Sequence, residues 1–334
     1  MKIPLFYAFL VVFLLLIPAG SFSQAPNLGS TSGFALFTAV GAFSNDGNTV
    51  VTGDIGTNVG AFTGFPPGIV IGQIYVADVI SAQAAVDVDA AFMELSMVTC
   101  GPVIGVTMGN DQILTPNVYC IGAASTLEGD LILDGQCDPD AIFIIKIDGA
   151  LATGVSSNVV LTNSASLCNV YWQINGAVSL GNNSVFRGTI LANGAITLLE
   201  GATLFGRGLS REGAIDLHNN VVDIDMQPDA SVITAGSAVT FCEGGSVMLS
   251  GNCGGTWSNG NTNATITVST SGDFFVTTTN ACGSAISNHI IVTVNTLPVC
   301  TISGNTTICQ GEATELCAPA GAVSYLWSTG VSTN

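Results

Sequence analysis

Positive charge is almost absent from this sequence. Its 334 residues include five Lys and Arg against 23 Asp and Glu, which gives a formal net charge of −18. A nucleic-acid partner requires clustered cations that neutralise phosphates, and an anionic membrane surface attracts the same clusters. The composition therefore excludes nucleic acids and anionic membrane surfaces as partners.

Groups for metal binding and catalysis are also scarce. The chain has only two histidines, His218 and His289, and none of its ten cysteines belongs to a CxxC pair. No nucleophile stands beside a base, and no two carboxylates stand at a defined catalytic spacing. The aspartates between Asp130 and Asp140 are interpreted as turn residues rather than calcium ligands, because their spacing matches no known calcium loop. We therefore expect no enzyme, no cofactor and no metal site.

What the sequence does contain is a repeat between Phe143 and Leu217. A phrase that begins with Gly-Ala recurs at offsets of 27, 18 and 19 residues, starting at Gly149, Gly176, Gly194 and Gly213. One strand-like run precedes each phrase and another follows it. Three short β runs in 18 or 19 residues are typical of one coil of a β-solenoid, whose stacked coils share one core. The sequence therefore predicts a mainly β protein built on a β-solenoid.

One segment has helical periodicity instead. Between Ala77 and Val98, apolar residues recur every three or four positions, at Ile80, Ala84, Val88, Ala91 and Leu95. A helix of this length spans about 33 Å, which is enough to run alongside six or seven coils spaced by about 4.8 Å. We expect it to cover the face made by the first runs, which contains Phe143, Tyr171 and Ile190. The segment after it, from Cys100 to Asp140, is less regular.

The N-terminus has the features of an export signal. Lys2 is followed by an apolar stretch from Ile3 to Ile17, and small residues end the segment at Ser23. Export into an oxidising compartment favours disulfides over free thiols. The predicted pairs are Cys100–Cys120 as a staple on the less regular segment, Cys253–Cys282 within the first C-terminal repeat, and Cys137–Cys168.

The composition changes after Asp225, where the chain becomes rich in Ser and Thr. Residues 239–249 match residues 306–316 at an offset of 67, and Trp257 matches Trp327 at an offset of 70. These repeats resemble the tandem immunoglobulin-like β-sandwich modules of bacterial surface proteins. We divide the chain into a signal peptide at 1–23, a solenoid domain at 24–226, a sandwich at 227–296 and the start of a second, truncated sandwich at 297–334.

The region from Asn27 to Asp225 contains a series of characteristic phrases in a fixed order. They are Phe34-Ala35-Leu36, Thr52-Gly53-Asp54-Ile55-Gly56, Gly64-Phe65-Pro66-Pro67-Gly68, the Ala-rich helix, Asp138-Pro139-Asp140-Ala141-Ile142-Phe143, Asn169-Val170-Tyr171-Trp172-Gln173-Ile174, Gly188-Thr189-Ile190-Leu191-Ala192 and Gly206-Arg207-Gly208-Leu209. With these phrases the region resembles a known family, the secreted ice-binding proteins of bacteria, fungi and microalgae. The resemblance implies a discontinuous β-solenoid flanked by one long helix, and contact with ice through a flat, rigid face.

The resemblance also suggests which part of the solenoid would contact ice. Members that bind ice often carry Thr-(Ala/Gly)-x-(Thr/Asn) at the corner between two faces, and here the nearest match runs from Thr153 to Ser156. With the helix on the first run, the second run, the third run and their corner remain open. Alternation along the third run would also point Phe186 and Val222 outward. The predicted ice-contact residues are Thr153, Ser156, Asn158, Ser179, Asn182, Ser184, Thr197 and Thr203.

Two functions remain open from the sequence. The first is an extracellular ice-binding protein, antifreeze or inhibitor of ice recrystallisation, with a monomeric solenoid that is secreted or attached to the cell through a missing C-terminal part. The second is a non-enzymatic adhesin that uses the same rigid solenoid to hold a glycan or another protein. After cleavage of the signal, neither function involves insertion into a membrane.

Overall fold

A computed structural model of the chain describes residues 24–225, 227–297, 301–321 and 324–332. The segment interpreted as an export signal lies outside this described part. Among the described residues, no helix is both long and apolar enough to span a membrane. The chain divides into two compact units, of which the first contains the chain up to Ile233 together with Gly251–Ala264 and Phe275–Asn288.

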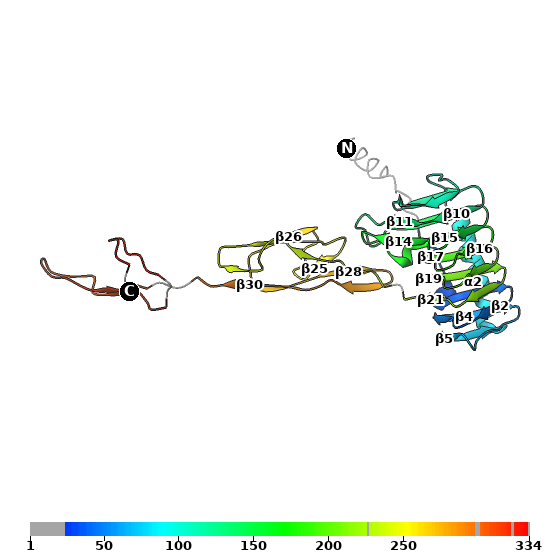
Figure 1. Cartoon of the computed structure of the whole chain (residues 1–334), viewed down its shortest axis with the longest axis horizontal. Coiled ribbons are helices and arrows are strands. Elements are labelled where there is room, and N and C mark those ends of the chain that lie inside the picture. Colours follow the sequence, from blue (N-terminus) through cyan, green and yellow to red (C-terminus); the bar gives the residue numbers. More distant parts are fainter. Residues whose placement is uncertain (1–23, 226, 298–300, 322–323, 333–334) are drawn as a thin grey trace, which may run out of the picture. The chain divides into compact units, whose positions relative to one another are not determined.

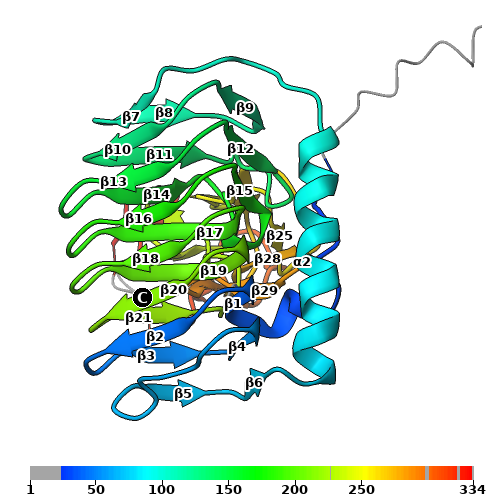
Figure 2. The same cartoon turned by 90° about the vertical axis from the view of Figure 1, so that its right-hand side faces the viewer.

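The first unit is built on a β-solenoid, as the repeat predicts, and each coil adds strands to three faces (Figure 2). Strands of neighbouring coils pair in parallel. The first face stacks, in order, β9 (Asn117–Ile121), β12 (Phe143–Ile147), β15 (Val170–Ile174), the second halves of β17 (Val185–Ala192) and β19 (Thr203–Glu212), β1 (Phe34–Val40), β4 (Asp54–Val59) and β6 (Ile74–Val76).

The other two faces continue the same coils. The second face stacks β7 (Thr107–Gly109), β10 (Ser125–Glu128), β13 (Leu151–Thr153), β16 (Val178–Leu180), β18 (Ile196–Leu198), β20 (Ile215–His218) and β2 (Phe43–Asp46). The third face stacks β8 (Gln112–Leu114), β11 (Asp130–Asp134), β14 (Asn158–Thr162), the first halves of β17 and β19, β21 (Val221–Asp223), β3 (Val50–Thr52) and β5 (Ile69–Ile71).

The stacking order of the coils departs from their order in the chain. The first coil, β1 to β3, stacks on the last coil, so that Phe43 pairs with Ile215 and Val50 with Val221. In Figure 1 the first coil, coloured blue, accordingly lies next to the green last coil, which contains β21. The chain then forms β4, β5 and β6 at one end of the solenoid. Helix α2 carries the chain to the other end, where β7 begins. This is the discontinuous solenoid that the family resemblance implies.

The long helix of the described part of the chain, α2, runs from Val79 to Met97 and agrees with the sequence prediction. Its N-terminus is closed by a reciprocal capping box. The Asp78 carboxylate accepts the Ser81 backbone N–H at 2.7 Å, and the Ser81 hydroxyl accepts the Asp78 N–H at 2.8 Å. The predicted apolar stripe is buried at Ala84, Val88, Ala91 and Leu95, whereas Ile80 is 42% exposed.

Helix α2 covers the first face, as expected from its alanine-rich stripe (Figure 2). The strand residues that pack against it include Ile144, Tyr171, Leu191 and Leu209. Of the three residues predicted on this face, only Tyr171 meets the helix, because Phe143 and Ile190 alternate into the solenoid interior. At the end of the helix, the Lys146 ammonium group donates to the carbonyls of Ser96 at 2.9 Å and Val98 at 2.7 Å. These bonds satisfy carbonyls that a helix end leaves unpaired.

The segment from Cys100 to Asp140 is more regular than its sequence suggests. It forms five strands, β7 to β11, which complete the coils at one end of the solenoid. The sequence pattern was weak because β7 and β8 have only three residues each. The predicted Cys100–Cys120 disulfide is present and ties the chain that follows the helix to strand β9.

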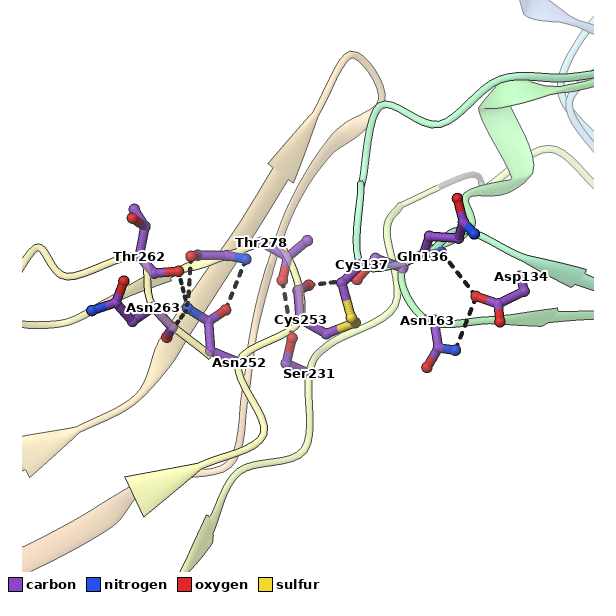
Figure 3. The surroundings of a disulfide bond; sticks show 12 residues. Asp134, Gln136, Cys137, Asn163, Ser231, Asn252, Cys253, Thr262, Asn263 and Thr278 are labelled. Atoms are coloured by element: carbon purple, nitrogen blue, oxygen red, sulfur yellow. Dashed lines mark hydrogen bonds between the residues drawn. A yellow bond between two sulfur atoms is a disulfide. The ribbon is translucent and has the colours of Figure 1, made fainter. Parts of the chain in front are cut away.

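The other two predicted disulfides are wrong. Cys137 pairs with Cys253 (Figure 3), and Cys168 pairs with Cys282. Residues 251–264 and 275–288 belong to the same compact unit as the solenoid, so their cysteines meet solenoid loops rather than each other. Close packing accompanies the first bond, since the Ser164 hydroxyl donates to the Cys253 carbonyl at 2.5 Å. Pairing by nearness in sequence failed because the partners are more than 100 residues apart.

The rest of the chain forms short sheets. The strands are β22 (Thr234–Ala235), β24 (Val247–Ser250) and β26 (Thr265–Val268) in one sheet, β23 (Thr240–Cys242), β30 (Ile290–Asn295) and β27 (Gly272–Phe274) in a second, β25 (Thr256–Trp257), β28 (Val276–Asn280) and β29 (Gly283–Ile286) in a third, and β31 (Ser303–Gly304) with β32 (Leu316–Cys317). The third sheet lies in the first compact unit. The immunoglobulin-like assignment and the domain boundaries stay predictions.

Candidate functional site

The second face of the solenoid presents two rows of small side chains to solvent. The outer row, here called the alanine row, contains one alanine at the start of the second face in each coil from that of β10 onward. In stacking order its members are Ala124, Ala150, Ala177, Ala195, Ala214, Ala42 and Ala61, each exposed or half-buried. Backbone hydrogen bonds fix the register, for example from Val178 N–H to the Ala195 carbonyl at 2.7 Å.

A second row, here called the central row, lies two residues further along each strand. Its members are Thr107, Thr126, Ala152, Ser179, Thr197, Asp216, Ser44 and Thr63, in register from coil to coil. Every member except Asp216 is Ala, Ser or Thr. Neighbours are about 4.8 Å apart across coils and about 6.6 Å apart along a strand. The two rows therefore form a regular array of methyl and hydroxyl groups.

This array is held flat by the core beneath it. The residues between the two rows, such as Leu151, Val178 and Ile196, point inward and are fully buried. Interiors of this kind pack as densely as organic crystals, so the strands above them have little freedom to move. Ser179 and Thr197, two of the predicted ice-contact residues, lie on the outer side of these strands, where both are half-buried.

The corner between the second and third faces has its own backbone pattern. Its residues occupy the left-handed region, with φ of 56° at Ser156, 55° at Asn183, 70° at Gly201 and 52° at Asn219. Gly and Asn tolerate this conformation best, which explains their recurrence at the corner. Ser156 is exposed as predicted, and so is Asn182 in the adjacent coil.

Two of the predicted contact residues are wrong, because their side chains lie inside the solenoid. Thr153 is 7% exposed and Ser184 is 1% exposed. Thr153 follows inward-pointing Leu151 by two residues and therefore points the same way. Its hydroxyl accepts the Gly181 N–H at 2.8 Å and donates to the Ser184 hydroxyl at 3.3 Å. These groups stabilise the corner from within and cannot touch a ligand.

The third face is less even than the sequence suggested. Phe186 and Val222 were expected to point outward, yet both are buried, because the corner shifts the alternation of β17 and β21 by one residue. The predicted contacts Asn158 and Thr203 do face outward and are half-buried. Around them lie large and charged groups.

Arg187 is an example of the large and charged side chains on the third face. Its guanidinium lies 5.3 Å from the centre of the Phe205 ring and donates to the Asn158 side-chain carbonyl at 2.6 Å. Burial lowers the pKa of Arg187, while the nearby Asp229 carboxylate acts in the opposite direction. A surface that mixes Arg, Phe and Val side chains is neither flat nor weakly hydrated. The second face is therefore the better candidate for contact with a regular surface.

Sequence reasoning missed several members of the two rows. Thr107, Thr126 and Ser44 belong to coils outside the repeat that was recognised. A signal was available, since the same Gly-Ala phrase occurs at Gly41, Gly60 and Gly122. The register of Ser44 could not be found from the sequence, because it depends on the first coil stacking on the last.

Catalysis has little support on this surface. Ser44 donates to the Asp216 carboxylate at 2.7 Å, and the His218 ring lies 3.1 Å from the other oxygen of that carboxylate. A nucleophilic serine would need the imidazole as its partner, whereas here the carboxylate stands between them. Within the described segments, no group of three or more His, Cys, Asp or Glu residues could hold a metal ion.

Comparison with known proteins agrees with this geometry. Residues 37–223 match the family model described as Ice-binding-like. The chain is 34% identical over 226 residues to an ice-binding protein of Nostoc sp. (strain HG1), covering 64% of this chain and 83% of that protein.

Solved structures show the same similarity. An ice-binding protein from the Antarctic ascomycete Antarctomyces psychrotrophicus aligns with a TM-score of 0.58 and 33% identity, over 60% of this chain and 98% of that one. One from an Antarctic Flavobacteriaceae bacterium aligns with a TM-score of 0.58 and 36% identity, over 66% of this chain and 54% of that one. With more than half of its length matched by the family model, the chain belongs to the Ice-binding-like family.

Proposed function

We propose that this protein binds ice, and that it does so through the alanine row and the central row of the second face. The observation that carries the proposal is their register: small methyl and hydroxyl groups repeat at about 4.8 Å in one direction and about 6.6 Å in the other. A rigid array on this scale can order water into a lattice-like layer. The relatives named above, which are ice-binding proteins, support the same activity.

The proposed contact surface revises the set expected from sequence. Ser156, Ser179, Asn182 and Thr197 remain in it, because they face solvent on the second face or at its corner. Asn158 and Thr203 border it on the third face. Thr126, Ala152 and the alanine row are added, because they lie in register with the retained residues.

The alternative of an adhesin that holds a glycan or a protein is less well supported. Sugar recognition in proteins uses polar groups that converge in a concave site with aromatic residues, whereas the two rows are flat and small. The named relatives also favour ice over a macromolecular partner, and they give no reason to expect an enzyme.

We also propose that the protein acts outside the cell, secreted or attached through its C-terminal repeats. Residues 227–296 and 297–334 would be immunoglobulin-like modules that carry the ice-binding domain. In support, Trp257 and Trp327 adopt the same local turn, with backbone bonds from Trp257 to Asn261 at 2.8 Å and from Trp327 to Val331 at 2.9 Å.

The activity is tested by measuring the growth of ice grains in a frozen sucrose solution that contains the purified protein. We expect inhibition of recrystallisation at micromolar concentration. If grain growth matches that with an equal amount of albumin, ice binding is rejected, and retention of the protein on immobilised glycans would then favour the adhesin.

A further inference from the structure

The central row is interrupted at one position by a charged side chain. Asp216 stands in register between Thr197 of β18 and Ser44 of β2. On one side of it the row runs through five uncharged members from Thr107 to Thr197. On the other side it continues with Ser44 and Thr63. A carboxylate therefore occupies a place that a hydroxyl or a methyl group occupies elsewhere.

The Asp216 carboxylate is held in this position. One oxygen accepts the Ser44 hydroxyl at 2.7 Å, and the other lies 3.1 Å from His218. Its side chain is 41% exposed, and that of His218 is 33% exposed. His218 in turn pairs in register with Asp46, which is exposed on the neighbouring strand. Asp216, His218, Asp46 and Ser44 thus form a polar cluster at one end of the second face.

The hydration of such a charged cluster is incompatible with a lattice-like layer of ordered water. An ionised carboxylate is strongly hydrated, and removing its water costs far more than removing water from a methyl or hydroxyl group. Its water molecules point their hydrogens toward the charge, which differs from their arrangement beside small neutral groups. The side chain is also larger than those of Ala, Ser and Thr, so it interrupts the uniform size of the row.

We infer that Asp216 limits the ice-contact surface, confining it to the coils from β7 to β18 and excluding the first coil from it. This inference rests on the proposed function, because it assumes that the second face meets ice. It assigns Asp216 the role of a boundary residue: it does not add to ice binding but prevents Ser44, Ala42 and Ala61 from extending the surface. The uncharged part of the central row would then grow from five coils to eight once the charge is removed.

Two substitutions separate charge from shape. Asp216→Thr gives the residue that occupies the corresponding place in β18, and Asp216→Asn removes the charge while keeping the size. The matched control is Asp130→Thr, which makes the same replacement at an exposed aspartate of strand β11 on the third face. Circular dichroism and the melting temperature confirm that each variant is folded, since surface substitutions of this kind change stability by only about 0.5 kcal/mol.

The readout is the protein concentration that halves the rate of ice recrystallisation. We expect Asp216→Thr to lower it by about threefold, which corresponds to about 0.7 kcal/mol. Asp216→Asn should lower it by less, and Asp130→Thr should leave it unchanged. A folded Asp216→Thr protein at or below wild-type activity would overturn the inference while leaving the proposed function in place. If wild type and every variant are inactive, the proposed function fails and the inference with it.

Discussion

The buried corner of the solenoid allows a sharp test of which side chains can meet ice. Thr153 was expected from sequence to contact ice, whereas the structure buries it. Replacing it by Val keeps the shape of the side chain and removes only the hydroxyl group. Thr197→Val makes the same chemical change on the second face, where the side chain is half-buried and faces solvent.

The expected effect on stability follows from the hydrogen bonds. The Thr153 hydroxyl accepts the N–H of buried Gly181 at 2.8 Å, and Val cannot replace that acceptor. A buried donor left without a partner costs about 1–3 kcal/mol. For a domain of this size, each 1 kcal/mol lowers the melting temperature by about 2–4 °C. With about 2 kcal/mol, the middle of that range, we expect Thr153→Val to melt about 4–8 °C below wild type, and Thr197→Val to melt within about 2 °C of it.

Thermal unfolding followed by circular dichroism measures this difference, and the recrystallisation assay near 0 °C measures activity on the same samples. Thr153→Val should remain fully active wherever it is folded, because its side chain lies beneath the surface. A Thr153→Val protein with wild-type melting temperature and reduced ice activity would refute this reasoning. That result would mean that the hydroxyl reaches solvent, as the corner motif in the sequence suggested.

Three further outcomes are expected. Asp78→Ala should lower the melting temperature at neutral pH. The hydrogen bond from the Ser81 N–H lowers the pKa of Asp78 below its ordinary value of 3.8, so the ionised carboxylate stabilises the folded protein above that pH. The difference in melting temperature between Asp78→Ala and wild type should therefore disappear as the pH falls through the lowered pKa. Peptide mapping without reduction should find Cys137 joined to Cys253, and removing both cysteines should cost about 4–5 kcal/mol on a chain-entropy estimate; free thiols there would contradict the structure. Lys146→Met should cost about 2 kcal/mol, because two carbonyls at the helix end lose a charged donor, whereas an unchanged melting temperature would show that water replaces it.

Much of the fold could be predicted from sequence because its signals are periodic. The Gly-Ala phrases gave the coils, and the three-to-four spacing from Ile80 to Leu95 gave the helix within two residues at its start. Both patterns arise because one side of each element is buried, which requires apolar residues at regular intervals in the sequence.

The disulfides and parts of the contact surface could not be predicted in the same way. The partners of Cys137 and Cys168 depend on how distant segments pack, and no local pattern encodes that. At the corner, a left-handed residue such as Asn183 changes which side of the next strand faces inward, so that counting alternate residues through the turn fails for Ser184 and Phe186.

The most direct test of the account is the uptake of the protein into growing ice. A chilled surface freezes part of a solution that contains a fluorescently labelled protein, and the protein in the ice is compared with that in the remaining liquid. We predict that wild type is enriched in the ice and that Ser179→Tyr/Thr197→Tyr, on the second face, is excluded from it. The control Ile132→Tyr/Val221→Tyr, on the third face, should remain enriched. Enrichment of the second-face variant together with exclusion of the third-face control would contradict the assignment of the ice-binding surface.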